Sequence, residues 1–290
     1  MIRILGTVFA ALLGLAFGSF LNVCLTRWPV GESIVKPPSH CRNCGRTLAW
    51  WENVPLVSWL VLRGRCRTCG AWIGWRYALV EAAVGIAWGE IAWRFPNWAP
   101  SSTSTALSFD IARSIGGAIF CWIVVALAAL DAEHLWLPDR LTWPGIVLGF
   151  IYSVVRIPSE NASAMASMGN NIHIQAAILS LINILSAAGI IIFIRRVYKF
   201  VRHREGLGLG DAKLMAMLAA WLGLPGALLS FAIGVVLGSL VAIVLRVRGK
   251  GIDSWASTML PLGTFLCIGG IVSSLWGQPI IAAYLRWAGF

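Results

Sequence analysis

The sequence predicts an all-α, polytopic membrane protein. Hydrophobic residues make up 58% of its 290 residues, charged residues only 12%, and the mean hydropathy is +0.78. Soluble globular domains hold about 25% charged residues, so this composition excludes that class. The apolar residues also gather in runs, several of them close to the ~20 residues that a helix needs to cross a bilayer.

These apolar runs predict about eight transmembrane helices. Gly223 and Pro225 mark a tight turn in the longest apolar stretch, which divides it into two helices and leaves the first of them unusually short. The eight helices are expected over residues 4–25, 77–93, 107–130, 140–156, 173–194, 212–222, 226–245 and 258–276.

The basic residues predict the orientation of the helices. Of the 23 Lys and Arg residues, 18 lie in the segments 26–76, 131–140, 195–213 and 246–251. Because basic loops stay in the cytoplasm, these four segments are expected there and both termini outside. The formal net charge of +11 is therefore expected to meet anionic membrane lipid and not nucleic acid.

The first cytoplasmic segment is the only one long enough to fold by itself. We therefore expect three parts: a first transmembrane helix over residues 1–25, a cytoplasmic loop domain over 26–76, and a membrane-embedded core over 77–290.

The loop domain contains two Cys-x-x-Cys pairs with 21 residues between them. Two such pairs brought together supply the four tetrahedral thiolates that a structural Zn²⁺ prefers. A disulfide pair or a redox motif is the alternative, but a reducing cytoplasm favours the metal. The predicted ligands are Cys41, Cys44, Cys66 and Cys69.

A glycine-rich segment, EGLGLGDAKL, leads into the short sixth helix and carries the carboxylate of Asp211. An ionisable group at the mouth of a membrane helix is costly, so it indicates a functional site. Alternate glycines leave the backbone open to a close approach by a substrate. A flexible connector with an acidic residue at a helix N-terminus is the alternative. The residues expected to bind substrate or shape this loop are Gly206, Gly208, Gly210 and Lys213.

A second carboxylate, Asp131, ends the third predicted helix on the same side of the membrane as Asp211. Two carboxylates that converge there can share a proton, so that one activates water and the other protonates a carbonyl. This pair predicts an aspartic peptidase. Asp139, eight residues after Asp131 and next to Pro138, is instead expected to cap the following helix.

Two other classes of function stay open at this point. In an ion or metabolite transporter, Asp131 and Asp211 would be coupling carboxylates inside the membrane. A non-catalytic assembly scaffold would leave both residues without a chemical role. The sequence shows no inverted hydropathy repeat of the kind that would favour a transporter.

Most of the chain resembles the bacterial type IV prepilin peptidases, which are leader peptidases and N-methyltransferases. The segments that carry the resemblance are GSFLNVCLTRWP, the paired cysteines with LAWWENVPLVSWLVLRGRC, WRYALVE, LDAEHLWLPDRLT and REGLGLGDAKLMAMLAAW. By this resemblance Asp131 and Asp211 take the two catalytic positions, and Asp139 matches a structural LPD motif.

The resemblance also implies the protein's partners and cofactors. They are prepilin or pseudopilin substrates, S-adenosylmethionine as methyl donor, and an inner membrane in which the active site faces the cytoplasm. The chain departs from the family where Thr264 stands in PLGT in place of an expected proline. This departure is not expected to touch the aspartate pair.

Overall fold

The computed structural model describes residues 1–94, 104–160, 171–203, 208–247 and 260–289. Over these residues the chain is helical and forms no β-strand, which confirms the all-α prediction. The helices are α1 (Ile2–Arg27), η1 (Trp50–Asn53), α2 (Val57–Val61), α3 (Arg76–Arg94), α4 (Ser104–His134), α5 (Asp139–Glu160), α7 (Asn171–Arg202), α8 (Leu209–Val247) and α9 (Leu262–Trp287).

The described helices have the length and composition of a multi-pass membrane protein. Five of them are long and apolar enough to cross a bilayer: α1, α4 from Ile111, α7 from Ile172, α8 and α9. Helices α3 and α5 form where they were expected but do not meet this criterion. The number of eight spans therefore stays a prediction.

The chain folds as two compact units, Met1–Ala126 and Leu127–Phe290. The sequence predicted three parts with other boundaries. That each of these three parts has its own role stays a proposal. The predicted connections over 95–103, 161–170 and 248–259 lie outside the described residues.

In the first unit, α1 and α3 pack through small residues. Gly14 and Gly18 of α1 face α3, where Gly85 and Gly89 face α1. A Cβ atom at Gly18 would lie 2.7 Å from the Cα atom of Glu81, so only glycine permits this approach. Glycines spaced by four residues let membrane helices pack backbone to backbone. This contact fixes Glu81 beside the end of α1.

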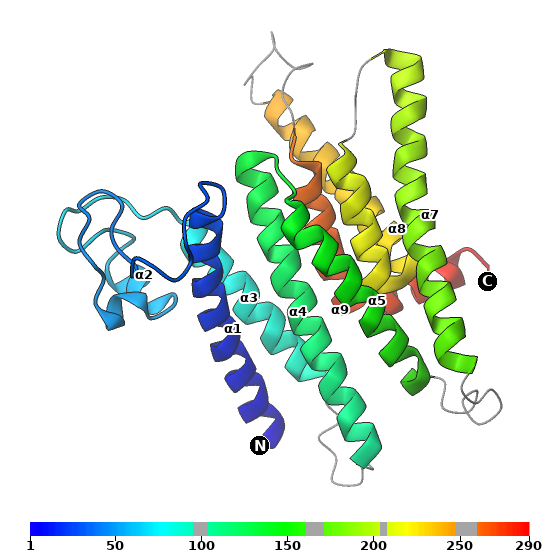
Figure 1. Ribbon diagram of the computed structural model, residues 1–290, viewed down its shortest axis with the longest axis horizontal. Coiled ribbons are helices and arrows are strands. Elements are labelled where there is room, and N and C mark those ends of the chain that lie inside the picture. Colours follow the sequence, from blue (N-terminus) through cyan, green and yellow to red (C-terminus); the bar gives the residue numbers. More distant parts are fainter. Residues whose placement is uncertain (95–103, 161–170, 204–207, 248–259, 290) are drawn as a thin grey trace. The chain divides into compact units, whose positions relative to one another are not determined.

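In the second unit, Gly223 divides α8 into two helical segments. Its φ of 71° and ψ of 172° are not helical, as the turn predicted at this position requires. Figure 1 shows the second, orange segment returning towards the end of the bundle where the first, yellow segment begins. The Trp221 indole N–H donates to the Gly145 carbonyl of α5 at 2.8 Å and so anchors the first segment before the turn.

Candidate functional site

Asp131 lies in the last turn of α4 and is 6% exposed. Its Oδ2 atom accepts a hydrogen bond from the Thr264 backbone N–H at 2.7 Å. The Thr264 hydroxyl lies 3.1 Å from this atom and 3.1 Å from the Ala128 carbonyl, and it shares its one proton between them. The helix ends just beyond it, at Leu135, which has a left-handed φ of 50°. A buried carboxylate needs such partners, because burial without them is unfavourable. Thr264 therefore fixes the position of the Asp131 carboxyl group.

The contact with Thr264 corrects one expectation. The departure from the family pattern at this residue was expected to leave the aspartate pair untouched, and that was wrong. A proline has no backbone N–H and no hydroxyl, so it could donate neither of the two hydrogen bonds. This contact could not be predicted from local patterns in the sequence, because Thr264 follows Asp131 by 133 residues.

Asp211 lies in the first turn of α8, where its Oδ2 atom accepts the Gly208 backbone N–H at 3.0 Å. An acidic residue at the third position of a helix often binds the backbone just before the helix in this way. The bond satisfies a free N–H group, and the positive end of the helix dipole favours the carboxylate. The structure thus shows the helix N-terminal role that the sequence left open.

The segments that carry Asp131 and Asp211 meet at one side chain of the second unit, that of Leu137. Leu137 lies beside two glycines at this point. A Cβ atom added to Gly210 would lie 3.2 Å from the Leu137 side chain, and one added to Gly263 would lie 3.1 Å from the same side chain. At Gly263 it would also lie 2.9 Å from the Asp131 carboxyl carbon. Gly263 therefore leaves room for the Asp131 carboxyl group, and Gly210 leaves room for Leu137. Gly206 lies outside the described residues.

Lys213 and Asp139 form an ion pair at 2.6 Å. Asp139 is exposed and is the first residue of α5, within one residue of the N-cap position, so its predicted role as the cap of this helix stays a prediction. The ion pair links the first turn of α8 to the first turn of α5. Because both side chains are substantially exposed, water screens the pair, and it contributes about 0–1 kcal/mol.

The four cysteines of the first unit form one cluster. Their sulfur atoms all lie within 4.8 Å of one another, and those of Cys41 and Cys69 are 3.8 Å apart. A tetrahedral Zn²⁺ with Zn–S bonds of about 2.3 Å places its ligands about 3.8 Å apart, so this donor set fits zinc. Backbone N–H groups of Cys69 and Thr68 lower the pKa of the Cys66 thiol to about 6. A thiolate is the form that binds a metal.

Two similar backbone turns bring the cysteines together. In the first, the Cys41 N–H donates to the Arg46 carbonyl and the Gly45 N–H donates to the Cys41 carbonyl. The second repeats this pattern from Cys66, with Gly70 at the corresponding place. Gly45 and Gly70 have φ values of 70° and 66°, which other residues rarely adopt. The sequence signal for this repeat is a glycine directly after each Cys-x-x-Cys pair.

Two family models match the chain. Residues 12–95 match the bacterial peptidase A24 N-terminal domain, and residues 118–243 match the type IV leader peptidase family. The first match contains the cysteine cluster and the second contains both Asp131 and Asp211. No solved structure matches the chain.

Several curated proteins are similar to it over nearly its whole length. The prepilin leader peptidase/N-methyltransferase of Pseudomonas aeruginosa is 34% identical over 96% of this chain and 93% of that protein. The protein of the same name from Xanthomonas campestris is 34% identical over 98% and 96%. That of Neisseria gonorrhoeae is 32% identical over 82% of each chain.

Proposed function

Since the chain belongs to the type IV leader peptidase family, we propose that it is a membrane aspartic peptidase that removes the basic leader from prepilins or pseudopilins. It then methylates the new N-terminal amine. The observation that carries this proposal is the pair of carboxyl groups, Asp131 and Asp211, each held by hydrogen bonds at a helix end, in segments that meet at Leu137.

The two carboxyl groups share one proton in the proposed reaction. The ionised one takes a proton from water as the water oxygen attacks the peptide carbonyl, and the protonated one donates to the carbonyl oxygen. The tetrahedral intermediate then collapses as the peptide nitrogen takes up a proton and leaves. Thr264 and the Gly208 N–H orient the two carboxyl groups, so that one water can lie between them.

The protein acts at the cytoplasmic side of the inner membrane in this proposal. The leader is cytoplasmic, and the apolar helix of the substrate lies in the bilayer. Gly206, Gly208 and Gly210 are proposed to let the extended backbone at the cleavage site approach closely, because glycine has no side chain. Lys213 shapes this region through its ion pair with Asp139.

The cysteine cluster holds a structural Zn²⁺, and S-adenosylmethionine supplies the methyl group. The metal joins the two turns of a loop that has little core of its own, so metal binding contributes directly to its folding. Cys41, Cys44, Cys66 and Cys69 are the proposed ligands.

The family match favours a peptidase over the ion or metabolite transporter that the sequence left open. The direct test incubates membranes that contain this chain with a prepilin and follows the substrate mass. We expect loss of the leader, followed by a gain of one methyl group when S-adenosylmethionine is present. An uncut prepilin, with a known peptidase of the family active in parallel, would contradict the proposal.

Thr264 provides a test of how Asp131 is held. The Thr264→Val change keeps the backbone N–H and removes the hydroxyl, which donates to the Asp131 carboxyl group and the Ala128 carbonyl. A hydrogen bond to a charged group is worth about 1.5–3 kcal/mol, so we expect leader cleavage to slow by roughly tenfold or more. Thr264→Ser, which keeps the hydroxyl, is the matched control. Equal cleavage rates for the Val and Ser variants would show that the hydroxyl does not position Asp131.

A further inference from the structure

Leu137 packs against the beginnings of two helices at once. A Cβ atom at Gly210, in the first turn of α8, would lie 3.2 Å from the Cδ1 atom of Leu137. A Cβ atom at Gly263, in the first turn of α9, would lie 3.1 Å from the same atom. Carbon atoms in ordinary contact are about 3.5–4.0 Å apart, so both positions need glycine. One side chain therefore lies directly against both helix backbones.

The two glycines each precede a residue that carries or holds one carboxyl group of the proposed active site. Gly210 directly precedes Asp211. Gly263 directly precedes Thr264, whose backbone N–H donates to the Asp131 carboxyl group at 2.7 Å. A shift of one helix beginning relative to the other would therefore move one carboxyl group relative to the other.

The segment that carries Leu137 has a fixed backbone on both sides. Before it, the Leu135 N–H donates to the Asp131 carbonyl at 2.9 Å and closes the last turn of α4. After it, Pro138 is buried, and its carbonyl accepts two backbone N–H groups of the first turn of α5 at 3.0 and 3.1 Å. Closely packed protein is nearly incompressible, so a side chain on a fixed backbone determines where its neighbours lie.

We propose that Leu137 is a positioning residue that sets the separation of the Asp131 and Asp211 carboxyl groups. The proposal rests on the peptidase part of the proposed function. Both carboxyl groups must reach one water molecule, and a misplacement of about 1 Å can slow such a reaction by roughly 10²-fold. Leu137 acts through the two helix beginnings and not by contact with the substrate. Its size should therefore affect kcat and not KM.

Cleavage kinetics of the purified full-length protein in lipid vesicles, with a prepilin as substrate, test this role. Leu137→Ala removes most of the side chain, and we expect kcat to fall roughly tenfold or more while KM changes less than about twofold. Leu137→Met nearly conserves the volume and should keep most of the activity. Melting temperature establishes that each variant is folded. Leu137→Val, a smaller reduction of the side chain, takes the place of the alanine variant if that variant does not fold.

An exchange of sizes between two positions gives the sharpest test. A Cβ atom at Gly210 would have atoms of Leu137 as its three nearest neighbours, so Gly210→Ala alone should lower kcat through overpacking. In the Leu137→Ala, Gly210→Ala double variant the added methyl group fills part of the gap. We expect its kcat to exceed that of Leu137→Ala by roughly threefold or more. Gly263→Ala should not rescue Leu137→Ala, because its Cβ atom would also lie 2.9 Å from the Asp131 carboxyl carbon.

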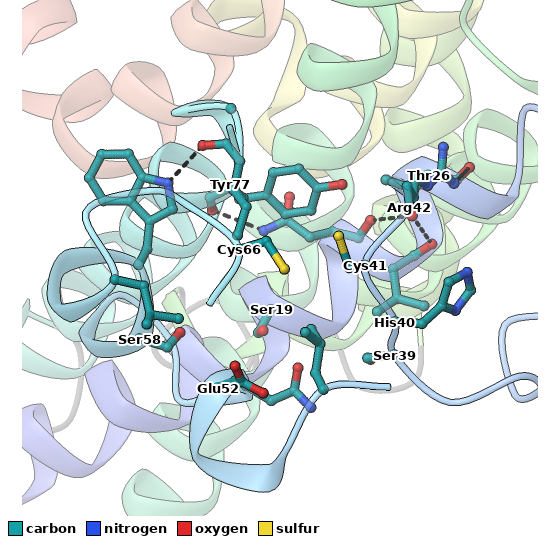
Figure 2. Close-up of a pocket in the computed structure, with 18 of the residues that line it drawn as sticks. Ser19, Thr26, Ser39, His40, Cys41, Arg42, Glu52, Ser58, Cys66 and Tyr77 are labelled. Carbon is teal, nitrogen blue, oxygen red and sulfur yellow. Dashed lines mark hydrogen bonds between the residues drawn. The ribbon is translucent and has the colours of Figure 1, made fainter. Parts of the chain in front are cut away.

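A cavity in the first unit provides the matched control. It has a volume of about 630 Å³ and is lined by Asn22 of α1, the cysteine loop and Glu81 of α3, among other residues. Figure 2 shows Glu52 of the loop beside its central space. Leu62 lines this cavity and is half-buried like Leu137, whereas neither Asp131 nor Asp211 lines it. Leu62→Ala makes the same change at a place that contains neither carboxyl group, and it should leave the kcat of cleavage unchanged.

The outcomes separate the positioning role from the proposed function. If the parent protein cleaves prepilin and Leu137→Ala keeps its kcat or raises KM instead, the positioning role is wrong while the peptidase stands. The same conclusion follows if Leu62→Ala lowers kcat as much as Leu137→Ala does, or if the folded double variant shows no recovery. If the parent protein does not cleave prepilin, both the positioning role and the peptidase activity are wrong.

Discussion

Asn in place of either Asp131 or Asp211 should lower leader cleavage by roughly 10²- to 10⁴-fold, the contribution typical of a general acid or base. Asn keeps the shape of Asp and can still accept the hydrogen bonds from Thr264 or Gly208. It cannot take a proton from water. The expected loss therefore arises from chemistry and not from misfolding, and it is measured as the rate of leader removal at matched protein levels in membranes.

The double variant and one further carboxylate sharpen this test. Because the two aspartates act as one unit, the Asp131→Asn, Asp211→Asn double variant should be little slower than either single one. Asp139→Asn should keep most of the activity, since it removes only an exposed ion pair with Lys213. Substantial cleavage by either single dyad variant would assign the chemistry to another residue.

Cys66→Ser should release the metal and destabilise the cysteine loop. Structural Zn²⁺ contributes about 10–16 kcal/mol to the folding of small zinc domains, and Cys66 is the buried member of the cluster. The parent protein should contain about one zinc ion per chain by elemental analysis, and the variant much less. The variant should also be cut faster by added protease within residues 26–76.

Cys121→Ala is the matched control for this change, because Cys121 is buried outside the cluster. It should keep the metal and the protease resistance of the loop. A metal-free protein after gentle purification would refute the zinc site, as would a Cys44–Cys66 disulfide in cells.

The sequence was sufficient for features that depend on local patterns. Apolar runs predicted where α1, α3, α5 and α7 form, because a helix buried in lipid must be apolar along its length. Gly223 predicted the break in α8 through its backbone freedom. The Cys-x-x-Cys spacing predicted a cluster, because each pair already forms one side of a tetrahedral site.

Features that depend on contacts between distant segments could not be predicted in this way. Nothing near Thr264 in the sequence indicates that it binds Asp131, because the contact exists only once α9 packs in the second unit. Asp139 next to Pro138 resembled a cap, and its ion pair with Lys213 on another helix has no local signal. The cavity that contains Asn22 and Glu81 requires the close approach of α1 and α3 through their glycines.

The break at Gly223 also bears on the depth of Asp211. The part of α8 that precedes it has roughly 14 residues and so extends only about 21 Å. This is less than the thickness of the hydrocarbon layer, which is about 30 Å. Because the residues from Leu214 to Trp221 are buried, protein and not lipid surrounds this short segment. Under the proposed function, Asp211 would therefore meet the junction between the polar leader and the apolar helix of a prepilin without that helix being drawn out of the membrane.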